Sequence, residues 1–116
     1  MSYVLGFDFD GVIHRYGQGD QGATIYDIPT PGAHEALQRY MTAFDVQIVS
    51  ARAARPEGVE AIQAWLVQHA LPLLPCSDRK PTGELLVMLD DRAWQFDGQF
   101  PTVDELLTFQ PWWKRA

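Results

Sequence analysis

The sequence predicts an α/β fold in which a mainly parallel sheet carries helices on both faces. The prediction rests on two observations: short apolar runs alternate with segments of helical spacing, and three of these runs end in polar residues suited to chemistry. Strands separated by helices are normally joined by right-handed crossovers, which makes neighbouring strands parallel. The chain of 116 residues has no internal repeat, linker or shift of composition, so we expect residues 1–116 to form one domain.

Three apolar runs are typical of buried strands, and each ends in polar residues. They are residues 3–9, ending in Asp10-Gly11, residues 46–49, ending at Ser50, and residues 85–89, ending in Asp90-Asp91. Two weaker strands are expected, one at 71–75 between prolines and one near 94–96.

Helices are expected between these strands. Thr30 and Pro31 suit the start of a helix over about 31–43, and Pro56 suits the start of a second helix, with Val59, Ile62 and Leu66 on its inner face. Residues 102–105 have the spacing of a capping box, which predicts a last helix to about Phe109, stopped by Pro111. The glycine-rich segment 14–24 is expected to be a loop near the site.

Composition excludes several classes of function. Hydrophobic residues make up 47% of the chain, yet no apolar run has the length of a membrane span, so no membrane partner is expected. The start of the sequence lacks a basic segment before its apolar run, and Cys76 is the single cysteine; both favour a cytoplasmic location. The net charge of −6 disfavours general binding to nucleic acid, although a nucleic-acid end stays open as a substrate.

Aspartates follow two of the three main strands. Because the carboxyl ends of parallel strands meet at one edge of a sheet, we expect Asp8, Asp10, Asp90 and Asp91 to gather there. Grouped carboxylates repel one another and require a cation, and oxygen ligands without a His or Cys cluster favour Mg²⁺. The sequence therefore predicts a magnesium site.

The charge balance of this predicted site adds a further expectation. Four carboxylates, one Mg²⁺ and Lys80 leave a net negative charge before any phosphate binds. We therefore expect either that Asp10 is protonated for part of the cycle or that Arg52 or Arg92 lies nearby. A carboxylate beside a metal can attack phosphorus, and a second carboxylic acid can protonate the leaving oxygen and then activate water.

Four segments, in order along the chain, resemble the motifs of the haloacid dehalogenase-like hydrolase superfamily. The first is Phe-Asp-Phe-Asp-Gly-Val at 7–12, the second is 48–52, the third is Lys80, and the fourth is Leu-Asp-Asp-Arg at 89–92. The resemblance covers roughly residues 4–97. It implies a Rossmann-like three-layer domain and a magnesium-dependent phosphatase.

The resemblance also implies a role for each matched residue. Asp8 is expected to be the nucleophile and a metal ligand, and Asp10 the general acid and base, which also offers its backbone carbonyl to the metal. Asp90 is expected to bind the metal, with Asp91 binding it directly or through water. The expected substrate-binding residues are Ser50, Ala51, Arg52 and Lys80. The presence of Asp10 favours phosphoryl transfer over cleavage of carbon–halogen bonds.

The chain departs from many members of this superfamily in having no room for a cap domain. About 18 residues separate Gly11 from Thr30, and about 30 separate Ser50 from Lys80. Capless members have open sites and often act on large substrates or as oligomers, so the expected partners are a phosphorylated small molecule or polymer end, and a homo-oligomer is an open alternative.

Two other functions stay open. The Ser-Ala-Arg and Asp-Asp-Arg segments are similar to the phosphatase half of polynucleotide kinase/phosphatases, which makes a nucleic-acid 3′-end phosphatase one alternative. The other is a catalytically quiet phosphate- or partner-binding module. His14 is expected to be structural, although it is the histidine nearest the site, and the aromatic C-terminal quarter is expected to pack across the sheet edge or to form an oligomer contact.

Overall fold

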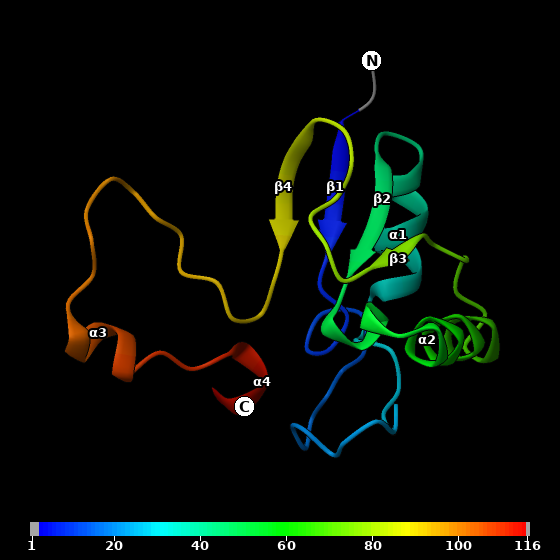
Figure 1. Ribbon diagram of the computed structural model, residues 1–116, viewed down its shortest axis with the longest axis horizontal. Helices are drawn as coiled ribbons and strands as arrows, with labels where there is room; N and C mark the ends of the chain where they lie inside the picture. Colours follow the sequence, from blue (N-terminus) through cyan, green and yellow to red (C-terminus); the bar gives the residue numbers. More distant parts are fainter. Residues whose placement is uncertain (1–2, 116) are drawn as a thin grey trace.

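A four-stranded parallel sheet forms the centre of the computed structural model, which describes residues 3–115 (Figure 1). The strands are β1 (Val4–Phe7), β2 (Asp45–Val49), β3 (Cys76–Ser77) and β4 (Leu85–Leu89), arranged in the order β3-β2-β1-β4. Every pair is parallel, and β1 lies between β2 and β4. The predicted α/β class with a parallel sheet is thus confirmed.

Two longer helices connect the strands. Of three shorter helices, one follows β2 and two lie in the C-terminal segment after β4. The connecting helices are α1 (Ala33–Met41), between β1 and β2, and α2 (Pro56–Gln68), between β2 and β3. The short ones are the 3₁₀ helix η1 (Ala51–Ala54), α3 (Val103–Leu107) and α4 (Trp112–Arg115). None of the helices within residues 3–115 combines the length and apolar character needed to cross a bilayer.

The hydrophobic core lies on one face of the sheet. Because side chains alternate along a strand, Leu5 and Phe7 point to the same face of β1. They are buried in one cluster with residues of β2, α1 and α2, namely Val46, Ile48, Leu37, Ile62, Trp65 and Leu66. The two long helices therefore pack on the same layer of side chains, which fixes the sheet beneath them.

The connection from β3 to β4 crosses the opposite face. The side-chain amide of Gln47 donates to the carbonyl of Thr82 at 3.2 Å and accepts from its N–H at 3.3 Å. A side chain at Gly6 would collide with Met88 and lie 3.1 Å from Pro81. Glycine at this position of β1 therefore allows the crossing chain to approach the sheet closely.

The ends of several elements differ from the prediction. Residues 71–75 form no strand, because Pro72 and Pro75 have no N–H to pair, and β3 begins only at Cys76. Helix α1 begins at Ala33 rather than at Pro31, since Gly32 adopts a left-handed conformation with φ of 90°.

The C-terminal segment differs from the prediction as well. Residues 94–96 form no strand in the described chain, and Pro111 precedes the helix α4 instead of stopping one. The capping box that opens α3 is present, with Thr102 and Glu105 each accepting the other's backbone N–H, although α3 ends at Leu107 rather than near Phe109.

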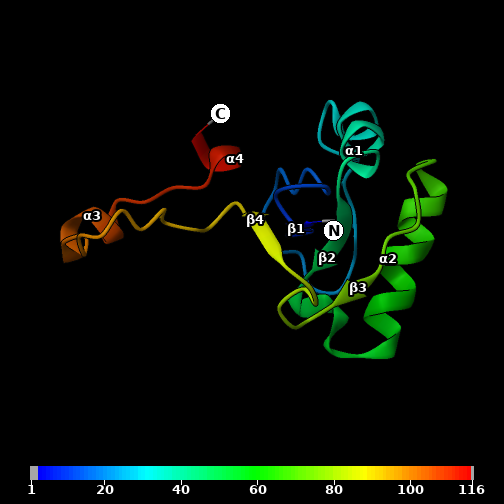
Figure 2. The same cartoon turned by 90° about the horizontal axis from the view of Figure 1, so that it is seen from above.

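The chain after β4 runs away from the sheet and then returns. Helix α3 lies apart from the strands in both views (Figures 1 and 2), and Phe100 and Leu107 are almost fully exposed. Helix α4 comes back to the loop that follows β1, where the indole of Trp112 donates to the carbonyl of Gly11 at 2.6 Å. The aromatic C-terminal quarter is therefore divided: its middle part is exposed, and its last part contacts the loop that follows β1.

Candidate active site

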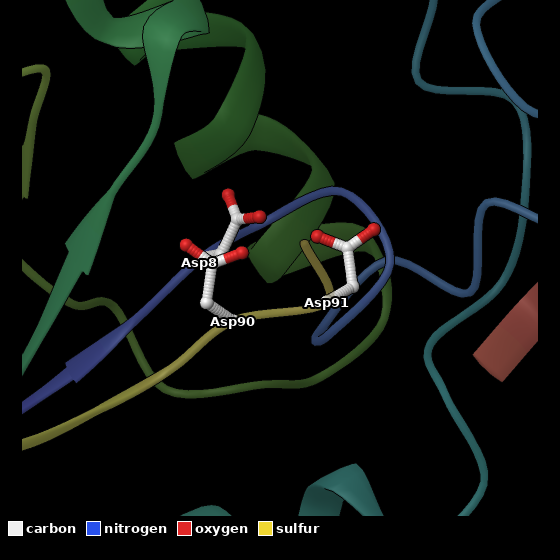
Figure 3. A group of neighbouring side chains, drawn as sticks. All are labelled: Asp8, Asp90 and Asp91. Atoms are coloured by element: carbon white, nitrogen blue, oxygen red, sulfur yellow. The ribbon is translucent and has the colours of Figure 1, made fainter. Parts of the chain in front are cut away.

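Three aspartates meet at the carboxyl ends of β1 and β4. Phe7 pairs with Leu89 in the parallel register, so the residues that follow them, Asp8 and Asp90, lie side by side. The backbone N–H of Asp8 also donates to the carbonyl of Leu89 at 2.9 Å, which extends the pairing by one residue. One carboxylate oxygen from each of Asp8, Asp90 and Asp91 lies within 4.8 Å of the others (Figure 3). We call these three residues the aspartate triad.

The aspartate triad holds a proton when no cation is bound. Burial, a hydrogen bond with Asp91 and the charges of Asp90 and Asp91 together raise the pKa of Asp8 from its usual 3.8 to about 8, against the N–H of Phe9, which lowers it. At neutral pH one proton therefore reduces the repulsion within the group. A divalent cation would serve the same purpose, and three closely spaced carboxylate oxygens are the donors that Mg²⁺ prefers.

The carboxylate of Asp10 lies outside this triad and is held by two other groups. His14 Nδ1 lies 2.8 Å from one of its oxygens, and Arg52 Nε donates to the other at 2.8 Å. Burial acts to raise the pKa of Asp10, but the hydrogen bonds from His14 and Arg52 outweigh it and hold this pKa below its usual value. The sequence led us to expect either a protonated Asp10 or a nearby arginine. The structure has the arginine, Arg52.

His14 is fully buried and connects Asp10 to the glycine-rich loop. Its Nε2 accepts the backbone N–H of Asp27 at 3.0 Å, so the proton of a neutral imidazole must be on Nδ1, which donates to Asp10. The ring stacks on Phe9 at 5.6 Å and meets the edge of Trp65 at 5.7 Å. His14 therefore has no open side for a substrate, and it orients Asp10, consistent with the structural role expected for it.

Arg52 is positioned by the turn that follows β2. Ser50 caps η1, because its Oγ accepts the N–H of Arg52 at 3.2 Å. The guanidinium Nη1 donates to the carbonyl of Ala23 at 2.8 Å, which connects η1 to the glycine-rich loop. A side chain at Gly58 would collide with the carbonyl of Arg52, so glycine at this position of α2 allows the helix to pack against η1.

Within the described chain, neither Lys80 nor Arg92, the two other sequence-predicted cations, forms an ion pair with the triad. Lys80 is exposed on the connection between β3 and β4, and within the described chain no hydrogen bond or ion pair joins it to the aspartates. Arg92 places its guanidinium 5.5 Å from the ring centroid of Trp113. Ser50 is buried at the end of β2, and Ala51 is exposed beside Arg52.

Sequence reasoning missed the contribution of the tryptophans in α4. The indole of Trp113 donates to Asp91 Oδ2 at 2.7 Å, so a side chain 22 positions away holds one oxygen of the triad. Gly11, with φ of 83°, leaves the space for this contact, because a side chain there would collide with Asp91 and Trp113. Indole N–H groups seek an acceptor when they are partly buried, but nothing in the sequence shows which acceptor is within reach.

Comparisons with protein-family models, with curated proteins and with solved structures find no match to the chain. Its function can therefore be inferred only from the motifs and from the geometry of the site.

Proposed function

We propose that this protein is a magnesium-dependent phosphomonoesterase of the haloacid dehalogenase-like type, acting through an aspartyl-phosphate at Asp8. The strongest support is the convergence of Asp8, Asp90 and Asp91, whose oxygens lie within 4.8 Å of one another at the sheet edge. Asp10, two residues after Asp8, is held separately by two hydrogen bonds, so the two carboxyl groups have different environments. Such a difference is typical of residues with separate chemical roles.

The donor set of the triad fits Mg²⁺. In the proposal, Asp8, Asp90 and Asp91 hold the ion through carboxylate oxygens, and Asp10 adds its backbone carbonyl. Bound Mg²⁺ would supply positive charge that shields the triad from an approaching phosphate. The proton that Asp8 keeps because of its raised pKa would leave when the ion binds, which frees the carboxylate to react.

Asp8 and Asp10 divide the two chemical steps. In the first, a carboxylate oxygen of Asp8 attacks phosphorus, the aspartyl-phosphate bond forms, the bond to the leaving oxygen breaks, and Asp10 in its acid form protonates that oxygen. In the second, Asp10 accepts a proton from the water that hydrolyses this intermediate, and His14 and Arg52 keep its oxygens in place. The proton taken up in the second step restores the acid form of Asp10 for the next substrate.

The remaining site residues are proposed to bind the phosphoryl group and the substrate. Ser50 and Ala51 lie at the end of β2 and the start of η1, next to Arg52. Arg52 already uses Nε and Nη1 for Asp10 and Ala23. Lys80 is exposed, so the proposal requires its flexible side chain to turn toward Asp8 when phosphate is bound.

The three-layer arrangement is also part of the proposal. Leu85, Leu86 and Val87 of β4 are roughly half exposed, and Leu107 of α3 is largely exposed. Cover for these side chains by α3 would add a helix layer to the sheet, and if that helix came from a second copy it would also account for a homo-oligomer.

The test uses purified protein, Mg²⁺ and 4-nitrophenyl phosphate. We expect Asp8→Asn to lower kcat by at least ~10³-fold, the scale seen when a nucleophile is removed. The matched control is Asp78→Asn, which changes an exposed aspartate outside the triad and should retain wild-type turnover. Full activity of Asp8→Asn would refute the nucleophile assignment. Magnesium-dependent phosphate binding without turnover of any ester would instead identify a quiet binding module.

A further inference from the structure

A hollow in the surface lies beside Asp10 and is separate from the aspartate triad. It has a volume of about 470 Å³ and lies between the glycine-rich loop, η1 and the first turns of α2. Asp10 and Arg52 line it, together with Ala51, whereas none of the three triad residues does. A volume of this size is within the range of pockets that bind small molecules.

Small side chains keep this hollow open. Ala54 is at the end of η1, and Gly58 and Ala61 are three residues apart on α2, so they share one face of that helix. Tyr16 supplies an aromatic wall from the loop side, where its ring meets the edge of the Trp113 ring at 5.2 Å. The hollow therefore combines apolar and aromatic surface with charged side chains, among them Asp10.

The charges around the hollow limit what it can accept. Asp10 and Arg52 neutralise each other through their hydrogen-bonded ion pair. The remaining charged residues of the lining are Arg55, Asp20 and Glu57, which sum to one negative charge. A leaving group carrying a second phosphate would meet these carboxylates, whereas an uncharged alcohol would not.

We propose that this hollow binds the leaving group of the substrate, and that the substrate is a monophosphate ester of an uncharged, ring-bearing alcohol about the size of a nucleoside. The inference rests on the proposed function, since it places the reacting phosphate between Asp8 and Asp10. It selects a small-molecule monophosphate over a nucleic-acid end, because a polynucleotide would bring further phosphates to Asp20 and Glu57.

The first experiment compares three substrates: adenosine 5′-monophosphate, adenosine 3′,5′-bisphosphate and acetyl phosphate, whose leaving group is too small to fill the hollow. We expect kcat/KM for the monophosphate to exceed that for the bisphosphate by roughly tenfold or more. A preference for the bisphosphate would overturn the inference, as would a preference for a 3′-phosphorylated oligonucleotide, measured as a fourth substrate.

The second experiment fills the hollow. Ala61→Phe should lower kcat/KM for adenosine 5′-monophosphate roughly tenfold more than it lowers kcat/KM for acetyl phosphate. The matched control is Ala64→Phe, an exposed position of α2 outside the lining, which should leave both values at the wild-type level. Equal losses on both substrates, or no loss, would contradict the inference.

A binding measurement separates failure of the inference from failure of the proposed function. If the protein hydrolyses neither these compounds nor 4-nitrophenyl phosphate, the proposed function is wrong, and equilibrium dialysis of adenosine alone decides the status of the hollow. Adenosine bound by wild type and Ala64→Phe, but not by Ala61→Phe, would support the hollow as a ring-alcohol site. Absence of adenosine binding to wild type would overturn it.

Discussion

Removing the charge of Asp8 should stabilise the metal-free protein at alkaline pH. The folded protein holds the Asp8 proton more tightly than the unfolded chain does, because folding raises this pKa from 3.8 to about 8. The stability of the metal-free protein should therefore fall as the pH rises from about 4 through about 8. Asp8→Asn has the shape of the protonated acid and carries no charge, so its stability should not fall for this reason.

The size of the effect follows from the pKa of Asp8. The difference between 3.8 and about 8 would correspond to ~6 kcal/mol, at about 1.4 kcal/mol per pH unit, for a group fully removed from water. Asp8 is only half-buried, so solvent screening should reduce this to ~2–3 kcal/mol. For a chain of this length that free energy raises the melting temperature by ~10 °C.

The assay is thermal unfolding followed by circular dichroism, with chelator present, at about pH 3.5 and about pH 9.5. Wild type and Asp8→Asn should melt together at the lower pH, where Asp8 is protonated in both the folded and the unfolded chain, and Asp8→Asn should melt higher at the upper pH. Asp78→Asn is the control for loss of a carboxylate outside the triad, and it should show no such pH-dependent gain. A difference between Asp8→Asn and wild type that does not change with pH would refute the electrostatic account of the triad.

Three further predictions concern the metal, the C-terminal helix and the packing of α2. Magnesium binding at about pH 7 should release close to one proton, because it displaces the proton on Asp8, and calorimetry in buffers of different ionisation enthalpy measures this; binding without proton release would contradict it. Trp113→Phe keeps an aromatic ring but removes the N–H that holds Asp91, so Mg²⁺ affinity should weaken by ~10-fold, and unchanged affinity would show that this hydrogen bond does not orient the ligand. Gly58→Ala should lower the free energy of unfolding by ~1–3 kcal/mol, because the new methyl collides with the carbonyl of Arg52, and an unchanged denaturation midpoint would refute this close contact.

The parts of the fold that could be predicted are those that depend on residues close together in the sequence, such as apolar runs and prolines. The apolar runs that form β1, β2 and β4 are bounded by polar residues, and Pro56 begins α2 as expected. The approach of Asp8 to Asp90 could also be predicted, since both follow parallel strands and the carboxyl ends of such strands share an edge.

The other features depend on contacts between distant segments, which periodicity does not encode. The proton position on His14 is set by the backbone N–H of Asp27, and the orientation of Asp91 by Trp113. Lys80 was predicted to bind phosphate from its spacing in the sequence alone. Its position depends on the connection from β3 to β4, which Gln47 holds against the sheet through Thr82. Strand β3 begins at Cys76, because Pro75 has no N–H and Cys76 is the next residue that has one opposite β2.

The most direct test of the central claim is chemical trapping of the aspartyl-phosphate. The protein is incubated with Mg²⁺ and acetyl phosphate, treated with borohydride, and its N-terminal peptide is sequenced by mass spectrometry. Borohydride reduces an acyl phosphate to the alcohol, so the account predicts homoserine at position 8 in wild type and none when phosphate donor or Mg²⁺ is omitted. Turnover of the donor with Asp8 unmodified, or with reduction at another carboxylate, would contradict the claim that Asp8 carries the phosphoryl group.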